Sequence, residues 1–121
     1  MSKSISLAIG IVTALLLSGC GDSSDVKIVK SGTLQLCPGH TVAKMVDGYM
    51  GKPSWESGKS ADGQAFVNVS GEITYSDKPV RAMIQFFIKG DNFAFNAFEM
   101  NGVPSPNLAG PLLNKMCESA K

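Results

Sequence analysis

Two periods of apolar residues organise the chain from residue 41 onward. The first period is helical, and its apolar residues, which recur at spacings of three and four, are Val42, Met45, Val46, Tyr49 and Met50. Thr41 precedes this run as a candidate N-cap, and Gly51 and Pro53 follow it as stop signals. The pattern therefore predicts a helix over residues 42–50.

From residue 65 the period changes to two, as in strands that bury one face. Three such segments, residues 65–75, 80–89 and 93–100, are separated by short polar turns, which predicts an antiparallel meander. Gly71 falls on the apolar face, where a bulge or close packing against a helix would explain it. The residues expected to face the core are Val67, Val69, Ile73, Tyr75, Val80, Ala82, Ile84, Phe86, Ile88, Phe93, Phe95 and Ala97.

The remaining segments carry weaker patterns. Residues 33–37 suit a short strand or extended arm, and residues 54–64 form a polar, glycine-containing loop around Trp55. A last helix is expected to begin near Gly110, with Pro111 at its first position. The apolar residues on one face of that helix are Leu112, Leu113, Met116 and Cys117.

Together these elements predict an α+β fold, with a three- or four-stranded antiparallel sheet and two helices packed on one face. We expect one globular domain over residues 32–121. Residues 20–31 begin with small polar side chains and are expected to form a tether ahead of the domain.

Several large apolar residues fall on the sheet face opposite the predicted core, where a two-layer domain would place polar side chains. One explanation for these residues is that the N-terminal arm or the loop around Trp55 covers them. The other is that another envelope protein docks there, because contiguous apolar patches mark interfaces. Met100 shares this predicted position. The residues expected to bind a partner are Trp55, Phe66, Met83, Phe87 and Phe98.

The first residues of the chain have the pattern of an export signal. One lysine, Lys3, precedes a 13-residue apolar run from Ile5 to Leu17. A membrane-spanning helix needs roughly 20 apolar residues, whereas a run of this length is typical of a signal peptide. We therefore expect residues 1–19 to be removed as a signal peptide.

The stretch Leu17-Ser18-Gly19-Cys20 resembles the lipobox of bacterial lipoproteins. The resemblance implies that the Cys20 thiol is diacylated, that cleavage precedes it, and that the new amino terminus is acylated. Several acyl chains hold a protein stably at a bilayer without a transmembrane helix. Gly21 after the anchor favours the periplasmic face of the outer membrane, while Asp22 leaves inner-membrane retention open.

The charge balance excludes some partners. Of 11 basic and 10 acidic residues, removal of Lys3 leaves ten of each, so the processed chain is formally neutral. Nucleic-acid binding requires a basic stripe, and a polybasic membrane patch is missing too. We therefore expect a membrane contact through lipid and a protein partner, with no nucleic acid and no evident small-molecule substrate.

Two cysteines, Cys37 and Cys117, remain after Cys20. An even pair in an exported domain predicts a structural disulfide, because that compartment is oxidising. The alternative is a reactive thiolate–imidazole pair between Cys37 and His40, which lie three residues apart. His40 is the only histidine, so no zinc spacing is formed, and we expect no metal and no cofactor.

One further resemblance concerns the domain itself. Gly39-His40-Thr41 followed by Val46-x-x-x-Met50-Gly51-Lys52-Pro53, a tryptophan-bearing loop and a strand meander resembles the SmpA/OmlA family of BamE-like small outer-membrane lipoproteins. The resemblance covers roughly residues 39–100 and implies a similar fold and a role in envelope assembly.

These observations favour a non-enzymatic lipoprotein that binds a protein or assists assembly in the periplasm. Two alternatives remain open at this point. One is an inhibitor or exclusion lipoprotein acting on an incoming enzyme or phage, and the other is a thiol-dependent activity of Cys37 and His40.

Overall fold

The computed structural model describes residues 22–120, so the signal peptide and the predicted lipidation at Cys20 lie outside the described residues. The fold is α+β, as the sequence predicts. Its elements, in chain order, are α1 (Ser24–Ser31), α2 (Val42–Asp47), β2 (Gly51–Lys59), β3 (Ala65–Tyr75), β4 (Lys78–Lys89), β5 (Asn92–Met100), β6 (Val103–Pro104) and α3 (Pro106–Ser119).

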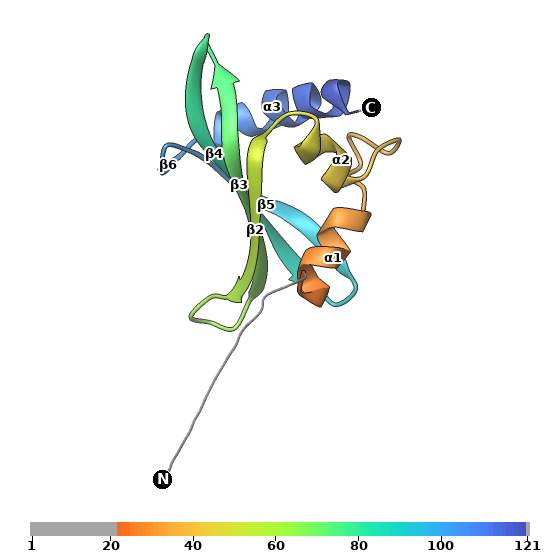
Figure 1. Ribbon diagram of the computed structural model, residues 1–121. Helices are drawn as coiled ribbons and strands as arrows, with labels where there is room; N and C mark the ends of the chain where they lie inside the picture. Colours follow the sequence, from red (N-terminus) through yellow and green to blue (C-terminus); the bar gives the residue numbers. More distant parts are fainter. Residues whose placement is uncertain (1–21, 121) are drawn as a thin grey trace.

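The strands form one five-stranded antiparallel sheet in the order β2-β3-β4-β5-β6, so every strand pairs with its neighbour in sequence. Helices α1 and α2 lie on one side of this sheet, and α3 crosses its upper part (Figure 1). The described part of the chain thus has one or two strands and one helix more than the sequence pattern predicts.

The hydrophobic core lies between the helices and one face of the sheet. Phe86 of β4 is at its centre, with 1% of its surface exposed. Its ring meets those of Phe93 and Phe95 edge to face, with centroids 5.6 and 6.5 Å apart. Such aromatic pairs add about 0.5–1.5 kcal/mol beyond the area they bury. All three rings come from positions that the period-two pattern predicts to face inward.

Helix α1 corrects the prediction of a tether over residues 20–31. Val26 and Val29, three residues apart, are both buried in the core, and Ser23 caps the helix by accepting a hydrogen bond from the Val26 N–H at 3.2 Å. The apolar positions in this segment are too few for the helical period to be visible in sequence. Packing against the sheet, rather than local pattern, forms this helix.

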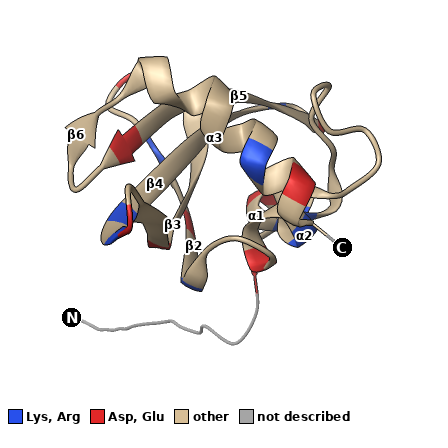
Figure 2. Ribbon diagram, turned by 90° about the horizontal axis from the view of Figure 1, so that it is seen from above, with Lys and Arg blue, Asp and Glu red and all other residues tan. Residues whose placement is uncertain are grey.

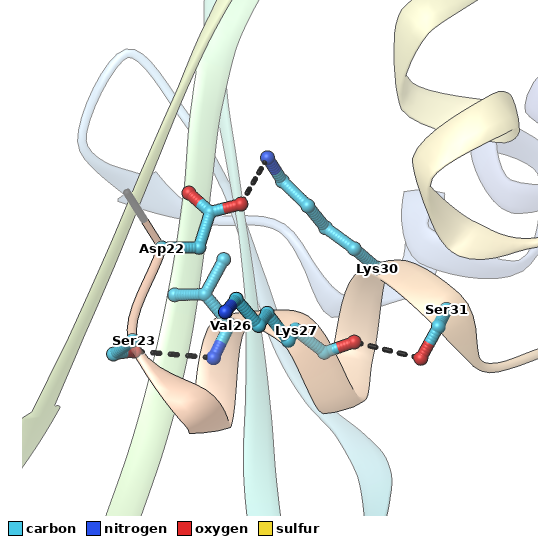
Figure 3. A network of polar contacts seen from close by, with 6 residues as sticks. All are labelled: Asp22, Ser23, Val26, Lys27, Lys30 and Ser31. Carbon is cyan, nitrogen blue, oxygen red and sulfur yellow. Dashed lines mark hydrogen bonds and ion pairs between the residues drawn. The ribbon is translucent and has the colours of Figure 1, made fainter. Parts of the chain in front are cut away.

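Polar contacts hold the start of α1 in place, and Figure 3 shows them from close by. Lys30 Nζ and Asp22 Oδ2 form an ion pair at 2.7 Å, and the Ser31 hydroxyl donates to the Lys27 carbonyl at 2.8 Å. Ser23 Oγ also lies 2.9 Å from Ser57 Oγ on β2. The chain is therefore bound to the domain from Asp22 onward.

Strand β2 corrects the prediction of a polar loop over residues 54–64. Residues 54–59 pair with β3 residue by residue, and only residues 60–64 form the connecting loop. Most side chains of this edge strand face solvent, so its residues do not show the apolar alternation of a half-buried strand. In the loop, hydrogen bonds from Ser60 and the Gln64 N–H lower the pKa of the Asp62 carboxyl.

The segment predicted as a short strand, residues 33–37, is instead a turn. Leu34 and Cys37 bridge each other, and the Cys37 N–H donates to the Leu34 carbonyl at 2.9 Å. The apolar residues here suited a strand, but the chain has no neighbouring strand to pair with. Cys37 is nevertheless buried, at 1% exposure.

Both predicted helices are present with different ends. Thr41 is confirmed as the N-cap of α2, accepting from the Lys44 N–H at 3.2 Å, but the helix ends at Asp47 rather than residue 50. Helix α3 begins at Pro106, four residues before Gly110, and the proline predicted to start it, Pro111, lies inside. An internal proline removes one main-chain hydrogen bond, which is why sequence reasoning places it at a start.

The predicted disulfide is present and joins Cys37, in the turn after α1, to Cys117 in α3. The two cysteines are separated by 80 residues, and their Cα atoms are 5.7 Å apart. The bond therefore ties the first turn of the domain to its last helix.

Two hairpin turns use residues with positive φ. Ser76 and Asp77, with φ of 51° and 64°, connect β3 to β4, and Asn101 and Gly102, with φ of 51° and 81°, connect β5 to β6. A two-residue type I′ turn requires positive φ at both positions. Asn101 also accepts a hydrogen bond from the Arg81 N–H at 3.0 Å, so this turn is fixed against β4.

Candidate functional site

The helices leave one face of the sheet without cover. Directly paired residues of neighbouring strands share a face, so the register assigns each position. No residue of this second face is buried. Its members, which we call the open face, are Ser54, Glu56, Gly58, Phe66, Asn68, Ser70, Glu72, Thr74, Pro79, Arg81, Met83, Gln85, Phe87, Lys89, Asn92, Ala94, Ala97, Glu99 and Pro104.

Three of the five residues predicted to bind a partner lie on the open face. Phe66 of β3 is directly opposite Phe87 of β4, and Met83 lies four residues earlier on β4. A Cβ atom at Gly58 would lie 2.9 Å from Cζ of Phe66, so the Phe66 ring lies over the backbone of β2 at that glycine. Side chains from β3 and β4 thus form an apolar centre on the open face.

Amides lie between the two phenylalanines and Met83. Asn68 and Gln85 are paired across β3 and β4, and the Asn96 Nδ2 donates to Gln85 Oε1 at 2.8 Å. Oδ1 of Asn68 is shielded from solvent and has no hydrogen-bond partner in the described part of the chain. A protein or water donor placed on this face would satisfy that oxygen.

Carboxylates surround the apolar centre of the open face. Its charged members are three glutamates, Glu56, Glu72 and Glu99, and two basic residues, Arg81 and Lys89, which gives a formal charge of −1. Elsewhere on the described ribbon, basic and acidic residues are interspersed (Figure 2). Of these glutamates, only Glu72 occupies an outward position of the period-two pattern; Glu56 is in β2, and the bulge at Asn96 turns Glu99 outward.

Phe98 is not on the open face, which corrects its prediction as a partner-binding residue. Gln85 pairs with Ala97 and Phe86 with Phe95, so Asn96 is an extra residue that forms a β-bulge. One inserted residue inverts the alternation beyond it. Phe98 consequently pairs with Ile84 in the core at 2% exposure, while Ala97, predicted to face inward, lies on the open face.

Trp55 is also on the core side, which corrects its assignment to a partner-binding loop. It pairs with Val69 and is half-buried against the core. The Lys30 ammonium of α1 lies 5.2 Å from the centroid of the indole ring, within reach of a cation–π interaction. Met100, paired with Ala82, is on the core side as well. Neither residue contributes to the open face.

The edges of the sheet are poorly suited to pairing with another strand. β2 carries Pro53 and a register shift between Gly51 and Ser54, and β6 has only two residues. Proline, bulges and very short edge strands all discourage strand addition. Recognition through this sheet is therefore more favourable at the open face than at its edges.

Two kinds of reactive site, a metal centre and a free thiolate, can be checked among the described residues. From residue 22 to residue 120, no group of three or more His, Cys, Asp or Glu side chains is placed to hold a metal ion. Cys37 is bonded to Cys117, so its sulfur has no thiolate to act with His40 while that bond is intact. Over the same residues, no helix combines the length and apolar character needed to cross a bilayer.

Comparisons with protein-family models, with curated proteins and with solved structures found no match for this chain. The resemblance of the domain to the SmpA/OmlA family therefore stays a prediction.

Proposed function

We propose that this chain is a lipid-anchored envelope protein that binds a partner protein through the open face, without enzymatic activity. One observation carries the proposal: all three helices pack on one side of the sheet, while Phe66, Met83 and Phe87 are half-buried on the other side, which no helix covers. Aromatic residues and methionine are enriched at protein interfaces and depleted at ordinary surface positions.

The composition of the open face indicates the chemistry of the partner. Its apolar centre suits aliphatic or aromatic side chains, and its three glutamates, against one arginine and one lysine, suit a partner with lysine or arginine around the glutamates. The periplasmic role and the outer-membrane location are proposed from the lipobox and the SmpA/OmlA resemblance.

The contacts at the start of α1 limit the distance between a lipid anchor at Cys20 and the folded domain. Because Asp22 and Ser23 are already bonded to Lys30 and Ser57, only Gly21 separates Cys20 from the folded body. At roughly 3.5 Å per extended residue, such a link keeps the domain within about 10 Å of the acylated residue. A domain held this closely stays near the bilayer surface.

The anchor is tested by the mass of the mature protein. We expect cleavage before Cys20 and added mass that corresponds to three acyl chains, with the protein recovered in the membrane fraction. Cys20→Ala is expected to abolish that added mass and release the protein from membranes, and Asn114→Ala, a change at an exposed position of α3, serves as the control. An intact leader without fatty acid would contradict the anchor but leave the open face untouched.

The partner-binding role is tested by photo-crosslinking in intact cells. p-Benzoyl-phenylalanine introduced in turn at positions 66, 83 and 87 is expected to capture the same protein, because these side chains share one uncovered surface. Position 114, an exposed residue of α3, is the control on the helix side. The identity of the captured protein then separates an assembly role from inhibition of an incoming enzyme or phage.

A further inference from the structure

A second feature lies away from the open face, between the β3–β4 hairpin and α3. It is an apolar groove of about 210 Å³. Phe98 and Leu112, both nearly buried, belong to its lining together with Met100 and Leu108. Side chains from three elements distant in sequence therefore form one hollow. We call it the hairpin groove.

The size of the hairpin groove limits what it can hold. A cavity of about 150 Å³ lined by aliphatic and aromatic side chains binds benzene, whereas drug-sized ligands occupy about 300–1,000 Å³. A groove of about 210 Å³ therefore fits a single ring or a short branched alkyl group. A long acyl chain exceeds it.

The charge of the hairpin groove indicates which polar group its ligand carries beside the apolar body. Lys115 is its only ionised lining residue, and no carboxylate lines it. Among the described residues, the Lys115 ammonium has no ion-pair partner. Lys78 pairs with the lining residue Tyr75 but is itself outside the lining. The nearby acids of the same elements, Asp77 and Glu118, are outside the lining.

The hairpin groove also opens far from the start of the domain. Ser23 contacts Ser57, which pairs with Val67, and Tyr75 lies eight residues further along β3. At roughly 3.3 Å per residue, that is about 26 Å. If Cys20 carries lipid, the groove is at the end of the sheet away from it and opens to solutes.

We propose that the hairpin groove binds a small monocarboxylate whose apolar body is one ring or a short branched chain. The body would pack on Phe98, Met100 and Leu112, and the carboxylate would meet the Lys115 ammonium. This ligand site is separate from the partner-binding role of the open face, so either can fail without the other.

Methionine methyl groups provide the readout. The sample is the chain as purified from cells, labelled with ¹³C-methyl methionine and studied by NMR in the presence of phospholipid nanodiscs. The probe ligand is 3-phenylpropionate. Met100 lines the groove and Met83 lies on the open face, so Met83 serves as the internal control. We expect the Met100 signal to shift and saturate, with a dissociation constant of about 4 mM or lower, as ordinary ligand efficiency gives, while the Met83 signal stays in place.

Matched variants test the charge. Lys115→Gln is expected to weaken binding about two- to fivefold, the effect of a solvent-exposed ion pair. Lys89→Gln, an exposed lysine at the far end of β4, is expected to leave binding unchanged. The uncharged analogue 3-phenylpropan-1-ol is expected to bind at least about twofold more weakly.

Several results would overturn the proposal. A Met100 signal that does not move by 20 mM, about five times the expected dissociation constant, means that the groove does not take this class of ligand. Equal binding of the alcohol and the acid would remove the role of Lys115. Tenfold tighter binding of a peptide that ends in a free phenylalanine carboxylate would assign the groove to a polypeptide terminus. Contact of nanodisc lipid with the Met100 methyl would assign it to lipid.

Discussion

Loss of the Cys37–Cys117 disulfide is expected to lower the free energy of unfolding by about 4.5 kcal/mol. The bond closes a loop of 80 residues, and a cross-link of that span restricts the unfolded chain by about this amount in the chain-entropy model. Small domains are stable by only about 5–15 kcal/mol. The bond therefore accounts for a large share of the stability of this domain.

Urea denaturation of the Cys37→Ala/Cys117→Ala variant against the oxidised wild type measures this loss. The Cys37 side chain is buried, so its truncation adds a smaller cavity cost, and wild type with the bond reduced separates the two effects. A difference below about 1 kcal/mol between oxidised and reduced wild type would show that the bond does not stabilise the domain in this way.

The neighbouring pair Phe86 and Phe87 gives the second large effect. Phe86→Ala is expected to destabilise the domain by about 3–5 kcal/mol, because it empties the centre of the core and removes two edge-to-face contacts. Phe87→Ala makes the same chemical change on the open face, where we expect less than about 1 kcal/mol.

Thermal or urea unfolding of the two variants checks this contrast directly. Equal losses would mean that both faces of the sheet are packed, so that some further part of the chain covers the open face. A larger loss for Phe87→Ala than for Phe86→Ala would reverse the assignment of the two faces.

The parts of the fold that sequence predicts best are those with a repeated apolar period. Strands β3 and β4 carry five or more alternating positions each, and their inward residues are buried or half-buried except Tyr75 at the end of β3. Met45 and Val46 of α2 are buried as its helical period predicts. Repetition makes the signal strong because each position supports the same assignment.

The elements that sequence reasoning missed have their cause in tertiary packing. Helix α1 depends on two buried valines and a cap, which is too short a pattern to separate from a tether. Strand β2 is at the sheet edge, where its order comes from pairing with β3 rather than from burial. Neither the packing of α1 nor the pairing of β2 produces a repeated apolar pattern in the local sequence.

The sequence predicts only those site residues that belong to an unbroken strand alternation. Phe66, Met83 and Phe87 follow from the alternation of β3 and β4, which continues without interruption. Phe98 does not, because the bulge at Asn96 shifts the register by one residue, and a single asparagine within a strand is too weak a signal to predict a bulge. The hairpin groove joins residues from the turn after α2, the β3–β4 hairpin, β5 and α3, which only the fold brings together.

Crosslinking yield at position 87 compared with position 114 in intact cells tests most directly whether the open face is the working surface. The account predicts one captured protein at position 87, shared with positions 66 and 83, and no such product at position 114. Capture of that protein at position 114 with none at position 87 would contradict it, since the working surface would then be on the helices.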